Sequence, residues 1–244
     1  MHIPTGHRCF ATVFLFTMVF LCCWLLLTPS AVVAGASRCH GTTADGSLDY
    51  GVRLPRSGPN FSSYSDLAWL AGRTYVHSEV RAIVLAAYQA LRHSQPGKVY
   101  VLGETGWKHG GRFRPHKTHQ NGLSVDFMTP VVDANGQSVP LPTSVFNRFG
   151  YAIEFDADSR ALGLTIDYAA LGAHLVALDR AAQARGHGLW RVIFDPQLQA
   201  GLLQTEYGPY IQRHITLSKR RAWVRHDEHY HVDFAIPCPT GAGR

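Results

Sequence analysis

The chain contains 244 residues, of which 46% are hydrophobic and 16% charged, and its formal net charge is +6. This length indicates one domain, and the absence of an internal repeat or low-complexity tract in the sequence excludes a repeat architecture. The basic excess is small and forms no Lys/Arg stripe, which excludes a typical nucleic-acid-binding protein but suits an anionic polymer as partner.

The start of the chain has the features of a secretory signal peptide, predicted over residues 1–36. An apolar run spans residues 11–27, and Ala34 and Ala36 form a small-residue cleavage motif. Cleavage there leaves residues 37–244 as an exported chain without a stable membrane anchor. An uncleaved anchor is the alternative, because the run is near the lower length limit of a spanning helix.

Two cysteines remain after this cleavage, Cys39 and Cys238, one near each end of the exported chain. An even pair of cysteines in an exported protein predicts a disulfide. It would tie the N-terminal segment to the body of the domain.

The first half of the exported chain predicts one helix and two strands. Residues 37–76 show no sustained period and are expected to form an irregular N-terminal arm. Apolar residues at helical spacing predict a helix over 78–95, ended by Pro96 and Gly97. Buried strands are expected over 98–104 and 123–128, on either side of a glycine-rich basic loop, 105–118.

The second half predicts a helix over 166–185, a strand over 190–195, a short helix over 196–204 and a last strand over 229–236. Helices and strands intermix without a βαβ rhythm. We therefore expect an α+β fold, with a small, mostly antiparallel sheet and helices packed against it. Three single histidines are expected on helix surfaces: His77, His174 and His187.

The segment RHDEHYHVDF, 225–234, concentrates histidines and carboxylates near the end of the chain. If it is extended from His229 onward, His229, His231 and Asp233 point to one face of the strand. His226 precedes this strand. Such a cluster indicates a chemical use, although a single histidine is more often a core or surface residue.

A second concentration of ligand chemistry lies at 110–127, where His116, His119 and Asp126 fall in and after the glycine-rich loop. Asp126 stands between apolar residues of a predicted strand, so its carboxylate needs a cation or several donors. Catalytic zinc takes three protein ligands from His and carboxylate and leaves a fourth position for water. His119, Asp126 and His231 supply that set, which would place a zinc site on the sheet.

These segments together resemble the penicillin-insensitive murein endopeptidases, zinc enzymes related to the lysostaphin-type and D-alanyl-D-alanine peptidases. The motifs that carry the resemblance are GGRF, H-x-x-H-Q-x-G-L-x-V-D (116–126) and H-x-x-H-x-H-V (226–232). The likeness extends across most of the exported chain, including a cysteine near each end. It implies a periplasmic metallopeptidase that cuts peptidoglycan between D-alanine and meso-diaminopimelate.

The resemblance also implies roles for individual residues. His119, Asp126 and His231 would be the zinc ligands. His116 would support them or contribute to a second metal, for which the matching region Asp156–Ala161 offers no His three residues after an Asp. We therefore do not expect a second metal.

His226, His229 and Glu228 are the candidate catalytic residues around the metal. EHYH (228–231) satisfies both the H-x-H of the endopeptidases and the E-x-x-H of the D-alanyl-D-alanine peptidases, in which the Glu is the general base. In one continuous strand, Glu228 would face away from His231 and could reach the site only if the strand began after it. His229 is therefore the preferred base and Glu228 the alternative.

Two other functions remain open from the sequence, a D,D-carboxypeptidase or dipeptidase acting on D-Ala-D-Ala and a non-catalytic wall-binding module. Trp107 is expected either to line a substrate groove or to anchor its loop. Four basic residues of this loop are expected either to meet the free carboxylates of a peptide cross-link or to be solvated: Lys108, Arg112, Arg114 and Lys117.

Overall fold

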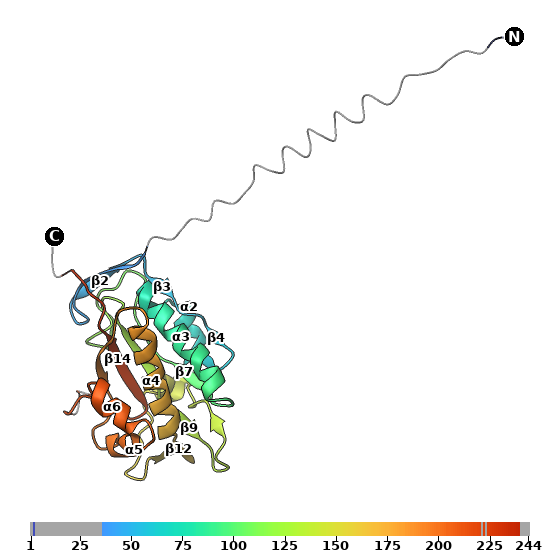
Figure 1. Ribbon diagram of the computed structural model, residues 1–244, viewed down its shortest axis with the longest axis vertical. Helices are drawn as coiled ribbons and strands as arrows, with labels where there is room; N and C mark the ends of the chain where they lie inside the picture. Colours follow the sequence, from blue (N-terminus) through green and yellow to red (C-terminus); the bar gives the residue numbers. More distant parts are fainter. Residues whose placement is uncertain (1, 3–35, 221, 223, 240–244) are drawn as a thin grey trace. The chain divides into compact units, whose positions relative to one another are not determined.

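A six-stranded sheet of order β13-β14-β8-β7-β5-β4 runs through the protein (Figure 1). The computed structural model describes residues 2, 36–220, 222 and 224–239, so most of the predicted signal peptide lies outside the described residues. All neighbouring strands in the sheet are antiparallel except β5 and β7. The strands are β4 (Ser57–Gly58), β5 (Phe61–Ser63), β7 (Tyr100–Leu102), β8 (Ser124–Met128), β13 (Leu189–Ile193) and β14 (His229–Phe234).

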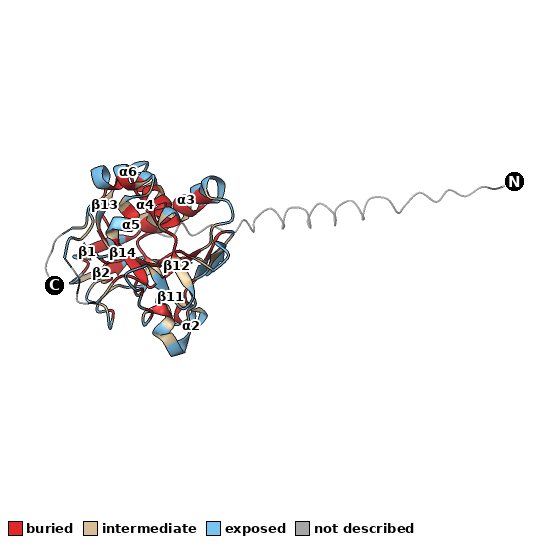
Figure 2. Ribbon diagram, turned by 90° about the horizontal axis from the view of Figure 1, so that it is seen from below, coloured by how far each residue is buried: buried red, intermediate tan, exposed pale blue. Residues whose placement is uncertain are grey.

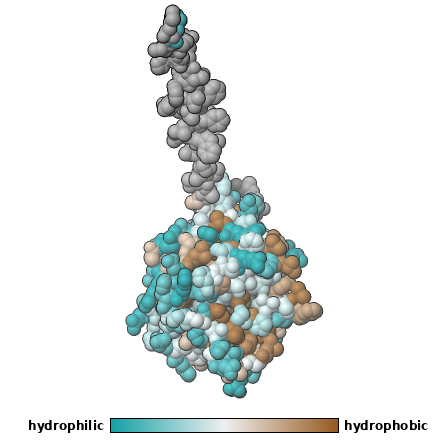
Figure 3. Space-filling model, turned by 90° about the vertical axis from the view of Figure 1, so that its right-hand side faces the viewer, coloured by the Kyte–Doolittle hydropathy of each residue, from teal (hydrophilic) through white to brown (hydrophobic). Residues whose placement is uncertain are grey.

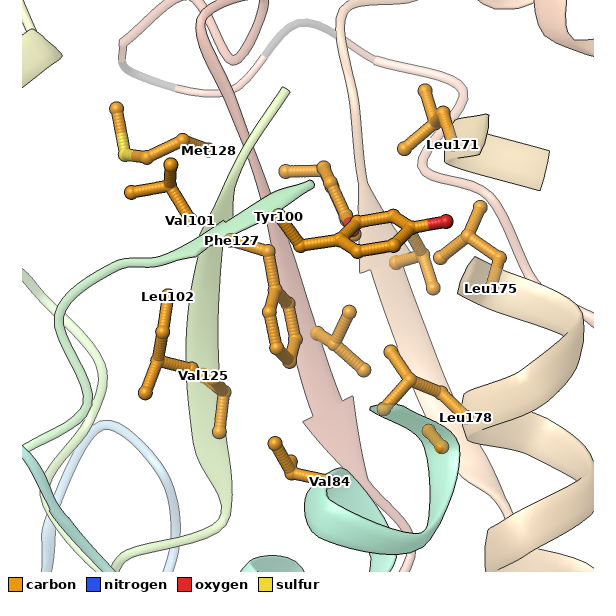
Figure 4. Packing of buried hydrophobic residues seen from close by; sticks show 14 of the residues in the cluster. Val84, Tyr100, Val101, Leu102, Val125, Phe127, Met128, Leu171, Leu175 and Leu178 are labelled. Atoms are coloured by element: carbon orange, nitrogen blue, oxygen red, sulfur yellow. The ribbon is translucent and has the colours of Figure 1, made fainter. Parts of the chain in front are cut away.

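Two long helices, α3 (Ser78–Ser94) and α4 (Tyr168–Gln183), pack against each other and against one face of this sheet (Figure 1). In the core, Leu171, Leu175 and Leu178 of α4 belong to the same buried hydrophobic cluster as Phe127 of β8 (Figure 4). Their spacing of three and four residues places these leucines on one side of the helix. The apolar stripes that predicted both helices therefore form the contact with the sheet.

Alternation along β8 and β14 gives the sheet an apolar face and a polar face. Phe127 and Tyr230 point to the helix side, where their rings stack at 5.4 Å between centroids, and Phe127 also meets the ring of His174 on α4 at 4.7 Å. Asp126 and His231 project from the other face. Both faces of these central strands are buried (Figure 2).

The segment expected to be an irregular arm, 37–76, contains several short elements. One of its strands, β5, joins the main sheet by parallel pairing with β7. Its other elements are β1 (Arg38–Gly41), β2 (Gly46–Asp49), β3 (Val52–Arg53), β4, α2 (Asp66–Leu70) and β6 (Tyr75–Val76). Strands of two to four residues are too short to show a period in the sequence, since their pairing comes from distant segments.

The remaining elements are a second sheet and several short helical segments. The second sheet has the order β10-β9-β12-β11. Its strands are β9 (Val131–Val132), β10 (Ser138–Val139), β11 (Arg160–Ala161) and β12 (Leu164–Ile166). The short helices α5 (Gln199–Leu203) and α6 (Gly208–His214) pack against α4, and η2 (Val145–Gly150) lies between β10 and β11 in the sequence. The short helix predicted to open at Pro196 begins three residues later, at Gln199.

Cys39 and Cys238 form the predicted disulfide, with their Cα atoms 5.3 Å apart across a sequence separation of 199. Cys39 lies in β1, and Cys238 follows β14. The bond thus joins the N-terminal segment to the strand that carries the histidine cluster, as expected.

The α+β class is confirmed, but two histidine placements are wrong. His174 is fully buried, because α4 is apolar on nearly all sides, and its Nδ1 hydrogen-bonds to the hydroxyl of Tyr230. His77 is also buried, and its Nδ1 accepts the backbone N–H of Glu79 as the N-cap of α3.

The exterior mixes polar and apolar side chains. On the face in Figure 3, hydrophobic patches interrupt a largely hydrophilic surface. Within the part of the chain that the structure describes, no helix combines the length and the apolar character needed to cross a bilayer.

Candidate active site

Strand pairing brings Asp126 and His231 together on the polar face of the sheet. In the β8–β14 ladder these two residues stand directly opposite each other. His231 Nδ1 lies 2.8 Å from Asp126 Oδ1, and its Nε2 lies 2.8 Å from Oδ1 of Asp233. The imidazole is thus held at both nitrogens by a carboxylate, and burial fixes it in place.

His119 approaches the same carboxylate from the glycine-rich loop. Its ring is fully buried, and Nδ1–H donates to the carbonyl oxygen of Thr105 at 3.0 Å. This bond leaves the lone pair on Nε2, which lies 3.3 Å from Asp126 Oδ1 and has no hydrogen-bond partner among the described residues. A buried nitrogen lone pair beside a carboxylate is the arrangement expected of a metal ligand.

Ionisation states also suit a cation at this point. Burial raises the pKa of Asp126, but His119, His229 and hydrogen bonds to it lower the value well below its ordinary range, so the carboxylate stays ionised. Burial lowers the pKa of His119 and keeps that ring neutral. Burial opposes a charge on His231, yet Asp233 and Asp126 raise its pKa to about 10, which shows that the flanking carboxylates favour positive charge there.

His116 lies on the other side of Asp126. Its Nδ1 is 3.6 Å from Asp126 Oδ2, and its Nε2 is 2.5 Å from Oε2 of Glu104. Ligand atoms of His116, His119 and Asp126 all lie within 4.8 Å of one another, so these three residues could hold a metal ion. A set of imidazole and carboxylate donors fits zinc and other divalent transition metals.

Glu228 lies in the site, which corrects the expectation that it faces away. Strand β14 begins at His229, so Glu228 is outside the alternation that governs the strand. Its Oε1 lies 2.8 Å from Nδ1 of His229. Both residues are buried and line the same cleft as His226, whose ring centroid is 4.5 Å from that of His229.

Burial shifts the pKa values of Glu228, His229 and His226 in the direction that favours the neutral form of each side chain. It raises the pKa of Glu228 to about 8, and it lowers those of His229 and His226 to about 4 and about 3. Around neutral pH, the two rings are therefore unprotonated and able to accept a proton.

A cleft of about 800 Å³ opens above these residues. It is large enough for a peptide segment, since ligand pockets typically span about 300–1,000 Å³. The residues that line it are Tyr64, Arg73, Glu104, Arg114, Pro115, His116, Lys117, Thr118, Arg148, Phe149, Tyr151, Arg191, Ile193, Ala222, Val224, His226, Glu228, His229 and His231.

The structure separates the basic residues of the glycine-rich loop into two groups. Arg114 and Lys117 line the cleft, whereas Lys108 and Arg112 are not among its lining residues. Trp107 anchors its loop: its ring packs against Phe113 at 5.2 Å, and its Nε1–H donates to the carbonyl oxygen of Arg112.

Tyr151, which no sequence pattern singled out, contacts the centre of the site. Its hydroxyl donates to Asp126 Oδ2 at 3.1 Å and accepts the backbone N–H of Glu104 at 3.2 Å. Its ring packs against those of His229 and His116 at 4.8 and 5.7 Å. A single tyrosine in a loop belongs to no motif, so only the folded chain identifies it.

Buried imidazoles and carboxylates at the base of an open cleft are the residue types from which the active site of a hydrolase can be built. Comparison with protein families agrees with this class and narrows it, since the model for penicillin-insensitive murein endopeptidases matches residues 39–244. The chain belongs to this family. A search of curated proteins returned no match.

Proposed function

We propose that this murein endopeptidase is a zinc metallopeptidase that hydrolyses the peptide cross-link between D-alanine and meso-diaminopimelate in peptidoglycan. The observation that carries the proposal is the convergence of His119 Nε2 and His231 Nδ1 on one oxygen of Asp126, at 3.3 and 2.8 Å. Two imidazole nitrogens and a carboxylate oxygen form the three-ligand set of a catalytic zinc, with the cleft above them for water and substrate.

We assign the metal to His119, Asp126 and His231, with His116 as a supporting residue. His116 faces the second oxygen of Asp126 and is already bonded to Glu104. His116 can therefore position Oδ2 of Asp126, while Oδ1 of the same carboxylate remains available to the metal. The group of His116, His119 and Asp126 is the competing assignment.

Zinc bound there would supply a Lewis acid for the scissile carbonyl and would lower the pKa of water toward 7. Proton transfer falls to Glu228 and His229. Nε2 of His229 lies 3.9 Å from Asp126 Oδ2 and faces the site, while Nδ1 is bonded to Glu228. The pair can accept the proton of the attacking water and deliver it to the leaving amine, with Glu228 fixing the ring orientation of its partner.

Tyr151 and Asp233 keep the ligands in position. Tyr151 occupies the second oxygen of Asp126, and Asp233 accepts the Nε2–H of His231, which fixes Nδ1 as the nitrogen that faces the site. Carboxylate–histidine–metal arrangements of this kind raise ligand basicity and orient the ring.

The experiment is digestion of purified sacculi and of cross-linked muropeptide dimers, followed by mass spectrometry. We expect dimers to be converted to monomers, a chelator to stop the reaction, and added zinc to restore it. Release of free D-alanine from uncrosslinked pentapeptides, without loss of dimers, would identify a D,D-carboxypeptidase instead. Binding to sacculi without any product would identify a wall-binding module.

Export to the periplasm is part of the same proposal, because the substrate lies outside the cytoplasm. The predicted cleavage after Ala36 would release the chain just before the matched region, which begins at residue 39. N-terminal sequencing of protein recovered from the periplasm tests this: a mature chain that starts at Ser37 is expected, and an intact leader in the membrane fraction would contradict it.

A further inference from the structure

The cleft carries an excess of positive charge. Among the described residues that line it, five are basic and two are acidic. Arg73 is paired with Glu104, and Arg191 with Asp233. The basic side chains that line the cleft are Arg73, Arg114, Lys117, Arg148 and Arg191.

Arg148 differs from the two paired arginines. Its side chain is exposed, and it makes no ion pair or side-chain hydrogen bond with any residue that the structure describes. It reaches the cleft from η2, on a segment separate from the glycine-rich loop that supplies Arg114. A guanidinium that lines a cleft without an internal partner is available to an anionic group of a ligand.

The backbone holds Arg148 in an unfavourable conformation to place it there. Arg148 has φ 52° and ψ 43°, and Phe149 follows with φ 59° and ψ 36°, so two successive non-glycine residues adopt left-handed geometry. Such strain persists only where surrounding structure enforces it, and it gathers at ligand-binding positions. Phe149 lines the cleft as well, with its ring against Tyr64.

The side chain of Asn147 stabilises this left-handed turn. Its side-chain oxygen accepts the backbone N–H groups of Ser144 and Gly150 at 2.8 and 2.9 Å, and its amide donates to the carbonyl oxygen of Pro142 at 2.8 Å. Gly150 packs so closely on Met128 that a Cβ would collide with its methyl group. The turn that presents Arg148 thus also contacts β8, the strand that carries Asp126.

We propose that Arg148 binds a free carboxylate of the peptide substrate and makes the enzyme selective for cross-links that carry one. This inference rests on the proposed function and adds a specificity-determining residue to it. The planar guanidinium can form two parallel hydrogen bonds with a carboxylate, an interaction that a neutral carboxamide at the same place cannot reproduce. The contribution is to binding, so the Michaelis constant changes more than the turnover number.

The test compares a cross-linked muropeptide dimer that has free carboxylates with the same dimer after chemical amidation. The variant is Arg148→Asn, because asparagine tolerates the left-handed conformation and carries neither the guanidinium nor a positive charge. Arg148→Lys keeps the charge without the planar fork. Arg112→Asn is the matched control, since Arg112 is an exposed arginine that does not line the cleft.

For the free-carboxylate dimer, kcat/KM should fall about tenfold in Arg148→Asn, less in Arg148→Lys, and not in Arg112→Asn. For the amidated dimer, Arg148→Asn and the unmodified enzyme should be equal. An equal loss on both dimers, or no loss on either, would overturn the assignment of Arg148. If the unmodified enzyme cleaves neither dimer, the proposed function fails, and equilibrium binding of the two dimers to the same proteins decides the role of Arg148 by the same criterion.

Discussion

Glu228 and His229 are neighbours in sequence, and their side chains also meet: Oε1 of the glutamate lies 2.8 Å from Nδ1 of the imidazole. The contact exists because β14 starts at His229, so that Glu228 belongs to the preceding turn and can fold back on the ring that follows it. The two candidates for the general base are therefore in contact with each other rather than on opposite faces of a strand, which is the arrangement on which the proposed proton transfer depends.

We expect Glu228→Gln and His229→Ala each to keep the metal and to lose roughly 10²- to 10⁴-fold in kcat, the range typical of general acid and base catalysis. Because the two residues act together, the double variant should be little slower than the slower single variant. Zinc content and dimer cleavage should be measured for all three. Near-normal cleavage by Glu228→Gln would restore His229 as a base that needs no partner.

Removal of a ligand should remove the metal. Asp126→Asn and His231→Ala are each expected to lose stoichiometric zinc after dialysis, because two remaining ligands hold the ion too weakly against water. His116→Ala should retain zinc at the main site if His116 only supports Asp126. Metal analysis of the three purified variants decides between the two ligand sets, and loss of zinc from His116→Ala with retention in His231→Ala would favour the competing one.

Asp233 should control metal affinity without touching the metal. Its Oδ1 accepts from His231 Nε2 at 2.8 Å and from the Ser124 hydroxyl at 2.6 Å, and its other oxygen pairs with Arg191. Asp233→Asn should weaken zinc binding by about 10- to 100-fold, as outer carboxylate partners of metal-bound histidines typically do. A competition titration against a chelator of known affinity measures this, and an unchanged zinc affinity would contradict the positioning role.

His174 should make the fold sensitive to acid. Burial lowers its pKa to about 3, whereas the unfolded chain takes up the proton near pH 6.5. Between these values the unfolded state binds more protons, so the free energy of unfolding is highest above pH 6.5 and falls as the pH is lowered.

Urea denaturation of wild type and His174→Gln at pH 7 and pH 4.5 tests this effect. Wild type should lose roughly 2.5 kcal/mol more than the variant across this interval, because each pH unit below the unfolded pKa corresponds to about 1.4 kcal/mol. His93→Gln replaces an exposed histidine of α3 and is the control. Equal losses in wild type and His174→Gln would show that the buried imidazole does not govern acid sensitivity.

The long elements could be predicted from sequence because each carries its own period. The predicted helices over 78–95 and 166–185 correspond to α3 and α4, observed at Ser78–Ser94 and Tyr168–Gln183. The last strand was predicted from alternation and runs over His229–Phe234. What the pattern of α4 did not reveal was the burial of His174, although an apolar surface on all sides of a helix is a sign that the helix is enclosed.

Other parts of the site depend on contacts between distant segments. The hydroxyl of Tyr151 donates a hydrogen bond to Asp126, which lies 25 residues earlier in the chain. Arg73 forms an ion pair with Glu104 across a separation of 31 residues. No local spacing encodes such pairs. The prediction that Glu228 faces away from the site was wrong for a different reason. A shift of one residue in the start of a strand changes the face on which a side chain lies.

The order of the strands has a consequence for biosynthesis. Among the described elements β14 comes last in the sequence, yet it lies between β13 and β8 and carries His231. Without β14, the edge strand β13 is separated from β8 and Asp126 lacks its opposing histidine. A chain interrupted before β14 therefore cannot assemble the proposed hydrolytic site, because it lacks His231 and the strand that places this residue opposite Asp126.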